Sequence, residues 1–318
     1  MNPSKKIKVY KYPAAKPHVH DSIPDYNNCI PFSEKGISDY CSLVSPQEAD
    51  YFYMGQYSFD RDTDLNLDNF PYFKDFPEKH IIDLEGDGGF GIPEYLWNSI
   101  ITVNGPLAHY DDKIPNLFVR PTFSKLFVDI CKNRFESPEE CYNRSVGFKG
   151  LINCQTRYDM FVNLHSSRGI LDTEMQANPT WNGPSEVGSA IQENYISSLK
   201  KRAFALCPRG AGVDSVRLLE ACYYGRIPIL ISDVDYLLVD HKHSDTSFVR
   251  RVIWDGKSDV APILKDIVSV DEAIIREDQI KARNYFENTL RKYMNDPTSY
   301  LINWMQKKGL LNNVCPKK

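Results

Sequence analysis

The chain has 318 residues, a formal net charge of −4, and 42% hydrophobic and 25% charged residues. This length accommodates two domains of ordinary size. The slightly acidic balance, without a basic stripe, argues against nucleic acid as a partner. No apolar run reaches the roughly 18 residues that a membrane-spanning helix requires, so the composition indicates a globular chain without a transmembrane segment.

The N-terminus is basic but lacks the apolar stretch of a secretory signal. We therefore expect a soluble, cytoplasmic protein, encoded by a bacterium or by a virus in its host, rather than a trimmed Golgi-type protein. The eight cysteines include no Cys-x-x-Cys pair, so we expect neither a zinc ribbon nor a thioredoxin-like site. Reduced thiols follow from the absence of a signal. The sequence carries no indication of an oligomeric state.

The first half of the chain has short apolar runs separated by polar loops. The strand predicted at 80–84 leads into an acidic glycine-rich loop, Glu85–Gly91, and residues 136–145, with a proline at 138, form the predicted domain linker. Residues 11–48 are predicted as loops with at most one short helix, and 96–103 as a helix or a strand. The other strands predicted here are 5–10, 50–54 and 116–119.

The second half alternates strand and helix patterns more clearly. A long polar loop is predicted at 173–188, after a short strand at 169–172. The remaining strands are predicted at 146–152, 203–207, 227–231 and 252–254, and the helices at 156–167, 189–201, 215–224, 259–267, 271–294 and 299–308.

The segment from Ala203 to Asp233 carries the strongest functional signal. It reads as strand, glycine loop, helix and strand, a crossover that favours parallel pairing. Gly210 lies in the loop, where a glycine lets the backbone approach a ligand. Ser215 is the predicted N-cap of the following helix.

The charges of this segment indicate an anion site. Arg209 and Arg217 lie at the positive end of the helix dipole, where a cation is unfavourable unless an anion binds between them. A phosphate there would be held by loop amides and guanidinium groups. Arg157 is a further candidate phosphate contact, or a surface ion pair. Glu220 is predicted to bind ribose hydroxyls, or to pair with Arg217. Asp233 either lines the same site or caps the next segment, and an ordinary βαβ unit with surface arginines remains the alternative for the whole segment.

This segment resembles the exostosin-type glycosyltransferases, glycosyltransferase family 47. The likeness is specific over about 146–233, with Ala205 and Arg226 standing where cysteine is common in the family, and it is faint in the N-terminal half. Upstream, Phe148, Lys149, Gly150 and Arg157 fit the family's entry to the same domain. The positions that fit the main pattern are Tyr195, Leu199, Phe204, Pro208, Gly210, Ser215, Arg217, Glu220, Ala221, Gly225, Ile227, Pro228, Ser232 and Asp233.

The resemblance implies an α/β chain of the GT-B fold, in which the parallel sheets of two Rossmann-like domains face a central cleft. Residues 1–140 would form the acceptor-binding domain and 146–295 the nucleotide-sugar-binding domain. A C-terminal helix within 299–318 would pack back toward the first domain. The implied reaction transfers a sugar with inversion and without a bound metal or other cofactor.

The site residues follow from this chemistry. Arg157, Arg209, Gly210, Ser215, Arg217, Glu220 and Asp233 are expected to bind the donor. The base that deprotonates the acceptor is expected in the acidic loop, as Asp87 or Glu85, with His109 and His165 as further candidates. Glu85-Gly86-Asp87 also resembles the triplet that holds Mn²⁺ in GT-A enzymes, but the phosphate loop already supplies positive charge.

Three functions are consistent with these observations. The first is transfer of a sugar such as xylose, galactose or glucuronate from a UDP-sugar to a hydroxyl of a glycan acceptor. The second is a fucosyltransferase-like GT-B enzyme that uses a GDP-sugar. The third is a non-catalytic GT-B scaffold. Relative stabilisation by UDP and GDP separates the first two, and turnover separates both from the third.

Overall fold

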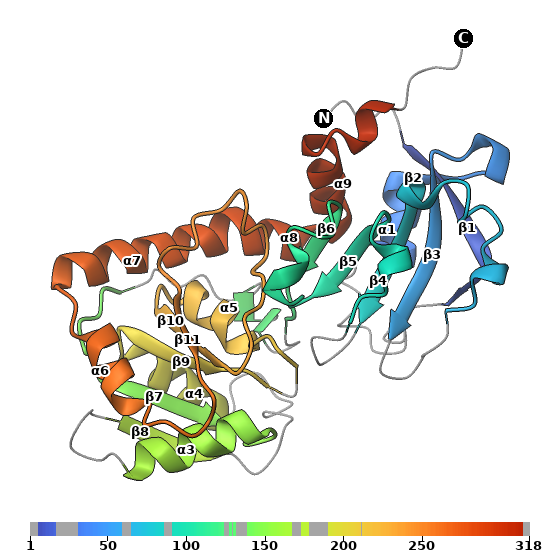
Figure 1. The fold of residues 1–318 in the computed structure, drawn as a ribbon. Helices are drawn as coiled ribbons and strands as arrows, with labels where there is room; N and C mark the ends of the chain where they lie inside the picture. Colours follow the sequence, from blue (N-terminus) through green and yellow to red (C-terminus); the bar gives the residue numbers. More distant parts are fainter. Residues whose placement is uncertain are drawn as a thin grey trace. The chain divides into compact units, whose positions relative to one another are not determined.

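The computed structural model describes residues 6–16, 31–58, 65–85, 91–123, 127–128, 130–131, 139–166, 173–177, 190–210 and 212–313. The chain divides into two compact units (Figure 1). Unit 1 comprises residues 1–121 together with 291–318, and unit 2 comprises residues 122–290. Each unit is built on parallel strands.

Unit 1 contains a six-stranded parallel sheet with the order β2-β1-β3-β4-β5-β6. Short 3-10 helices and the helix α1 (Glu34–Tyr40) lie between its strands. The 2-1-3-4-5 order at its core is one of the common orders of doubly wound α/β folds. The strands are β1 (Ile7–Lys16), β2 (Cys41–Leu43), β3 (Tyr51–Ser58), β4 (His80–Glu85), β5 (Ile100–Asn104) and β6 (Leu117–Arg120).

The two faces of this sheet are covered by different parts of the chain. One face packs into an aromatic cluster that includes Tyr12, Phe52 and Phe70. On the other face, Phe118 of β6 contacts Trp304, with ring centroids 5.3 Å apart. Trp304 belongs to α9 (Pro297–Lys307), which follows α8 (Arg291–Asn295). The C-terminal helices therefore complete the core of unit 1.

Unit 2 repeats the same strand order in two ladders. β7 (Val146–Gly150) pairs with β8 (Thr173–Ala177), and β9 (Phe204–Pro208) pairs with β10 (Ile227–Ser232), which pairs with β11 (Arg250–Ile253), all in parallel. β7 also lies alongside β9. The strands thus follow the spatial order β8-β7-β9-β10-β11, which is again 2-1-3-4-5.

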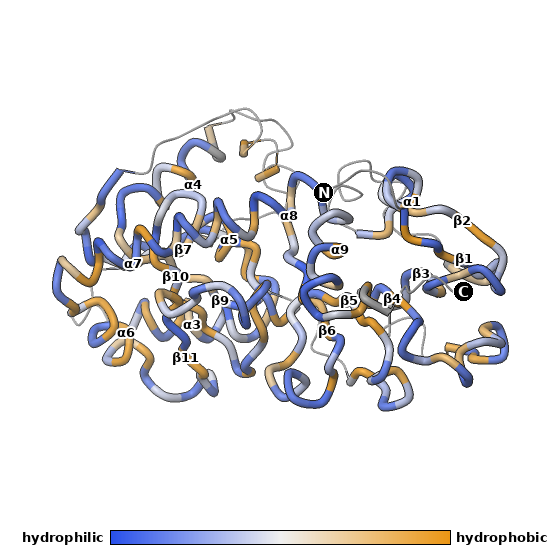
Figure 2. The backbone as a smooth tube through the Cα atoms, turned by 90° about the horizontal axis from the view of Figure 1, so that it is seen from above, coloured by the Kyte–Doolittle hydropathy of each residue, from blue (hydrophilic) through white to orange (hydrophobic). Residues whose placement is uncertain are grey.

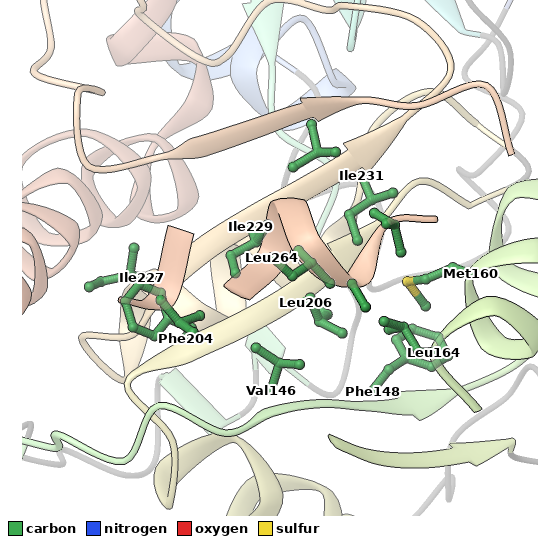
Figure 3. Close-up of a cluster of buried hydrophobic side chains, with 14 of the residues drawn as sticks. Val146, Phe148, Met160, Leu164, Phe204, Leu206, Ile227, Ile229, Ile231 and Leu264 are labelled. Carbon is green, nitrogen blue, oxygen red and sulfur yellow. The ribbon is translucent and has the colours of Figure 1, made fainter. Parts of the chain in front are cut away.

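Hydrophobic strands form the centre of unit 2. Every residue of β9 and β10 is buried, and Figure 2 lets the reader follow these hydrophobic stretches along the backbone. Side chains of β7, β9 and β10 gather against Met160 and Leu164 of α3 and Leu264 of α6 (Figure 3). Helices of this unit include α3 (Gln155–Ser166), α4 (Ala190–Lys200), α5 (Val216–Tyr223), α6 (Ala261–Val268) and α7 (Glu272–Tyr285), the last followed by a π-helical segment, Phe286–Leu290.

The expected α/β class with parallel sheets is confirmed, and most predicted elements appear within a few residues of their expected bounds. The segment 96–103, predicted as a helix or a strand, contains most of the strand β5. In the described part of the chain, no helix is both long and apolar enough to cross a membrane.

Three local predictions were wrong. β1 continues to Lys16 and β2 occupies Cys41–Leu43, both within the segment 11–48 that was predicted as loops with at most one short helix. β8 occupies 173–177, where a loop was predicted. β8 was missed because Thr173–Ala177 is polar, with exposed positions at its end. Its pairing with β7 decides its conformation. The strand predicted at 169–172 lies outside the described residues.

Candidate functional site

Arginine side chains gather where β7 and β9 end. The order of strands reverses between these two neighbours, because β7 continues to β8 on one side and β9 to β10 on the other. In open α/β sheets, ligands bind outside the carboxyl ends of the strands at such a switch point. Arg157 lies in α3 after β7, whereas Arg209 and Arg217 lie in the loop and helix after β9.

Arg217 is held rigidly between two aromatic rings. Its guanidinium carbon lies 4.6 Å from the ring centroid of Phe148 and 4.8 Å from that of Tyr195. Its Nη2 donates to the backbone oxygen of Lys149 at the end of β7. The residue is only 9% exposed, so its charge is largely desolvated. A cation desolvated and oriented in this way is prepared to bind an anion strongly.

Arg157 donates hydrogen bonds to backbone carbonyls at the ends of β7 and β9. Its Nε donates to the oxygen of Arg209 at 2.9 Å, and its Nη1 donates to the oxygen of Leu151 at 3.0 Å. Burial, and then the neighbouring charge of Arg217, lower the pKa of Arg157 below its ordinary value. The guanidinium groups of Arg157 and Arg217 both lie against the ring of Phe148, and an anion beside them would stabilise this arrangement.

Arg209 and Asp233 form an ion pair across the ends of β9 and β10. Arg209 Nε lies 3.0 Å from Asp233 Oδ1. The next residue, Gly210, donates its amide to the oxygen of Asp214 at 3.3 Å, which closes the loop. A Cβ at Gly210 would lie 3.4 Å from Arg157 Nη2. The amide of Gly210 is therefore engaged within the loop, and the absence of a side chain leaves room for Arg157.

Ser215 lies at the N-cap of α5, as predicted, with an extended backbone, but its hydroxyl makes no capping bond. Its backbone oxygen accepts from the amide of Leu218 at 3.0 Å instead, which closes the first turn. In the described part of the chain, the buried Oγ of Ser215 has no hydrogen-bond partner. A buried hydroxyl without a partner is costly, so a ligand atom that bonds it would be stabilising.

Glu220 accepts a hydrogen bond from the hydroxyl of Tyr195 in α4. No ion pair within 4.0 Å joins Glu220 to Arg217 among the residues that the structure covers, so the intrahelical alternative was wrong. Burial raises the pKa of Glu220, and the Tyr195 hydroxyl and the charge of Arg217 offset part of that rise. A carboxylate with one lone-pair direction used by a tyrosine retains others for ligand hydroxyls.

The sequence singled out Phe148, Gly150 and Tyr195 only as pattern positions, without a role. The structure places all three around Arg217. Because Gly150 has no side chain, Phe148 and Arg217 can pack against its backbone. A Cβ there would lie 2.9 Å from Phe148 Cζ and 3.2 Å from Arg217 Nη2. The sequence pattern that could have indicated this role is the close spacing of Phe148 and Gly150 near the end of the strand predicted at 146–152.

Of the four candidate bases, the structure describes Glu85, His109 and His165. Glu85 is the last residue of β4 and pairs in register with Ser58, and Asp87 lies outside the described residues. His109 is exposed, and His165 stacks on Phe161. Among the described residues, no group of three or more His, Cys, Asp or Glu side chains could hold a metal ion.

No protein-family model matches the chain, and no curated protein sequence matches it. A solved structure that resembles it is the crystal structure of TarM. The TM-score is 0.34 and the identity 13%, over 75% of this chain and 57% of TarM. The chain thus corresponds to less than two thirds of TarM. Because so distant a likeness assigns no function, the function proposed below rests on the site.

Proposed function

We propose that the chain is a glycosyltransferase whose unit 2 binds the diphosphate of a nucleotide-sugar donor at the carboxyl ends of β7 and β9. In detail, an inverting enzyme would move a sugar such as xylose, galactose or glucuronate from a UDP-sugar to a hydroxyl of a glycan. The GT-B arrangement around a central cleft and membership of the exostosin-type family are parts of the same proposal.

The observation that carries this proposal is the cluster of Arg157, Arg209 and Arg217 at the strand switch point. Three cations are accompanied there by Asp233 and by Glu220, whose pKa is raised. The cluster is therefore net positive and lies where α/β sheets bind phosphates. Departure of a nucleoside diphosphate needs stabilisation of its negative charge, which these guanidinium groups supply. Glu220 would accept hydrogen bonds from the ribose.

The same reaction needs a base for the acceptor hydroxyl. We assign this role to Glu85 or Asp87. The variants Glu85→Gln and Asp87→Asn separate the two, because only loss of the base lowers turnover while leaving UDP binding unchanged. A contribution of about 10²–10⁴-fold is typical of general base catalysis.

Nucleotide binding tests the proposal directly. We expect UDP to raise the melting temperature of the full chain by several degrees when it is in about 100-fold excess over its Kd. Replacing Arg209 with Gln or Arg217 with Lys should weaken UDP binding by about tenfold or more, because each removes a charge-assisted fork. Arg276→Gln is the matched control, since Arg276 is exposed and pairs with Glu140 at 2.9 Å.

The outcomes separate the candidate functions. Stronger stabilisation by GDP than by UDP would favour the fucosyltransferase-like alternative. Binding of UDP without hydrolysis or transfer of UDP-xylose, UDP-galactose or UDP-glucuronate would favour the non-catalytic scaffold. If neither nucleotide stabilises the protein, or if Arg276→Gln weakens binding as much as Arg217→Lys, the proposed site is wrong.

A further inference from the structure

Arg120, the last residue of β6, carries a buried charge at the carboxyl edge of the unit 1 sheet. It is only 4% exposed. Its Nη2 donates to the backbone oxygen of Leu84 in β4 at 2.8 Å. β5 separates β4 from β6, so the side chain and its hydrogen bond together span two strand spacings, about 10 Å.

Arg120 lacks the carboxylate partner that two other buried cations have, and it resembles the buried Arg226, which also donates to a backbone oxygen. Lys149 and Arg202 are as deeply buried, but both pair with the carboxylate of Glu174. Among the described residues, no carboxylate lies within the 4.0 Å of an ion pair from Arg120, and its buried Nε has no hydrogen-bond partner. A buried guanidinium without an anion is costly, and its fork geometry suits a carboxylate, sulfate or phosphate.

Asn104 provides a second polar group at the same place. It is the last residue of β5 and the register partner of Arg120. Its Oδ1 is buried and has no hydrogen-bond partner in the described part of the chain. An amide oxygen accepts hydrogen bonds, whereas a guanidinium donates them. The pair therefore offers complementary groups to a ligand that carries both an anion and a hydroxyl.

We infer that the carboxyl edge of the unit 1 sheet binds an acidic sugar, with Arg120 holding its anionic group and Asn104 accepting a hydroxyl. Ligands collect at this edge of parallel sheets. The role of that sugar as the acceptor rests on the proposed glycosyltransferase function, but its binding does not. A uronic acid supplies both groups, because its carboxylate lies beside ring hydroxyls.

Titration of the full-length protein tests the inference without any donor. Methyl β-glucuronide should bind at least about tenfold more tightly than methyl β-glucoside, which differs only in its neutral hydroxymethyl group. Arg120→Met should abolish this preference and leave UDP binding unchanged. Arg276→Met, a change at an exposed arginine, should alter neither. Glucoside 6-sulfate and 6-phosphate identify which anion the site prefers.

The results distinguish this inference from the proposed function. Equal binding of the glucuronide and the glucoside, with no gain from sulfate or phosphate, would overturn the inference even if UDP binds. A preference for the anion that persists in Arg120→Met would place the anion elsewhere and overturn it too. Arg120→Lys, which keeps the charge without the fork, should retain part of the preference, provided that UDP still binds as a sign of folding. Selective glucuronide binding without UDP binding would support the inference and contradict the proposed function.

Discussion

The carboxyl group of Glu220 is positioned for a ligand, and its burial lowers the free energy of unfolding when the group is ionised. Burial raises the pKa of its carboxyl group, so the folded protein favours the neutral form more than the unfolded chain does. The stability that Glu220 contributes therefore falls as the pH rises from the unfolded pKa to the folded one. Such a carboxylate is better explained by hydrogen bonds to a bound ligand than by packing alone.

His80 is a second buried titratable residue, and it belongs to the core of unit 1. Its Nδ1 lies 2.7 Å from the oxygen of Phe76, and its Nε2 lies 2.8 Å from the hydroxyl of Tyr12. Because a carbonyl can only accept, Nδ1 carries the proton and Nε2 accepts from the tyrosine. Burial lowers the pKa of His80 to about 4, which keeps the ring neutral among aromatic neighbours.

We predict that His80 makes unit 1 sensitive to acid. The contribution is fully present above the unfolded pKa of 6.5 and is lost as the pH falls toward the folded pKa of about 4. The shift corresponds to about 3 kcal/mol of the free energy of unfolding. Urea unfolding of His80→Gln near neutral pH and in mild acid should therefore show a smaller loss between the two conditions than the parent protein does.

The exposed His109 provides the control for this measurement. The variant His109→Gln should keep the parent's loss of stability in acid. If His80→Gln loses as much stability in acid as the parent does, the sensitivity arises from other groups.

At the scale of elements, the end of β7 fixes the geometry of the arginine cluster. We predict that Gly150→Ala lowers the free energy of unfolding by about 1–3 kcal/mol, a typical cost of overpacking. It should also weaken UDP binding by about tenfold. The reason is that the new Cβ would lie 2.9 Å from Phe148 Cζ and 3.2 Å from Arg217 Nη2, and both side chains are buried. Urea unfolding and UDP titration measure the two effects.

Gly91→Ala is the matched control, because its Cβ would lie 3.7 Å from the Tyr110 hydroxyl, an ordinary contact. This variant should change neither stability nor UDP binding appreciably. Unaltered UDP binding in Gly150→Ala would show that the position of Arg217 does not depend on the end of β7.

At the scale of the whole molecule, unit 1 is built from two separate stretches of the chain. We predict that deleting residues 291–318 unfolds unit 1 and spares unit 2. The deletion removes six buried apolar side chains, worth roughly 10 kcal/mol or more at about 1.5–3 kcal/mol each, which is comparable to the stability of a typical domain. These are Tyr293, Met294, Leu301, Ile302, Trp304 and Met305.

Hydrogen exchange measured by mass spectrometry reports on both units in one experiment. In the shortened chain, β3 to β6 should lose protection, while β9 and β10 should stay protected. Continued protection of β4 and β5 would mean that the C-terminal helices are dispensable for unit 1.

Strands and helices with strong hydrophobic periodicity could be predicted from the sequence, since burial of an apolar face is a local pattern. The crossover at 203–233 is the best case, because glycine, proline and apolar residues all indicate the same elements there. β8 could not be predicted, because its conformation comes from pairing with β7 rather than from its own polar residues.

Part of the candidate site could likewise be predicted from the sequence, and part could not. The sequence by itself determined that arginines, a glycine loop and Glu220 surround the start of α5, because residues close in the chain must lie close in space. Only the tertiary structure decided that Arg217 lies between Phe148 and Tyr195, that Ser215 leaves its hydroxyl without a partner in the described residues, and that Arg120 reaches Leu84. Such contacts join residues from different strands and helices, and the packing of those elements is set by the whole sequence at once rather than by any local pattern.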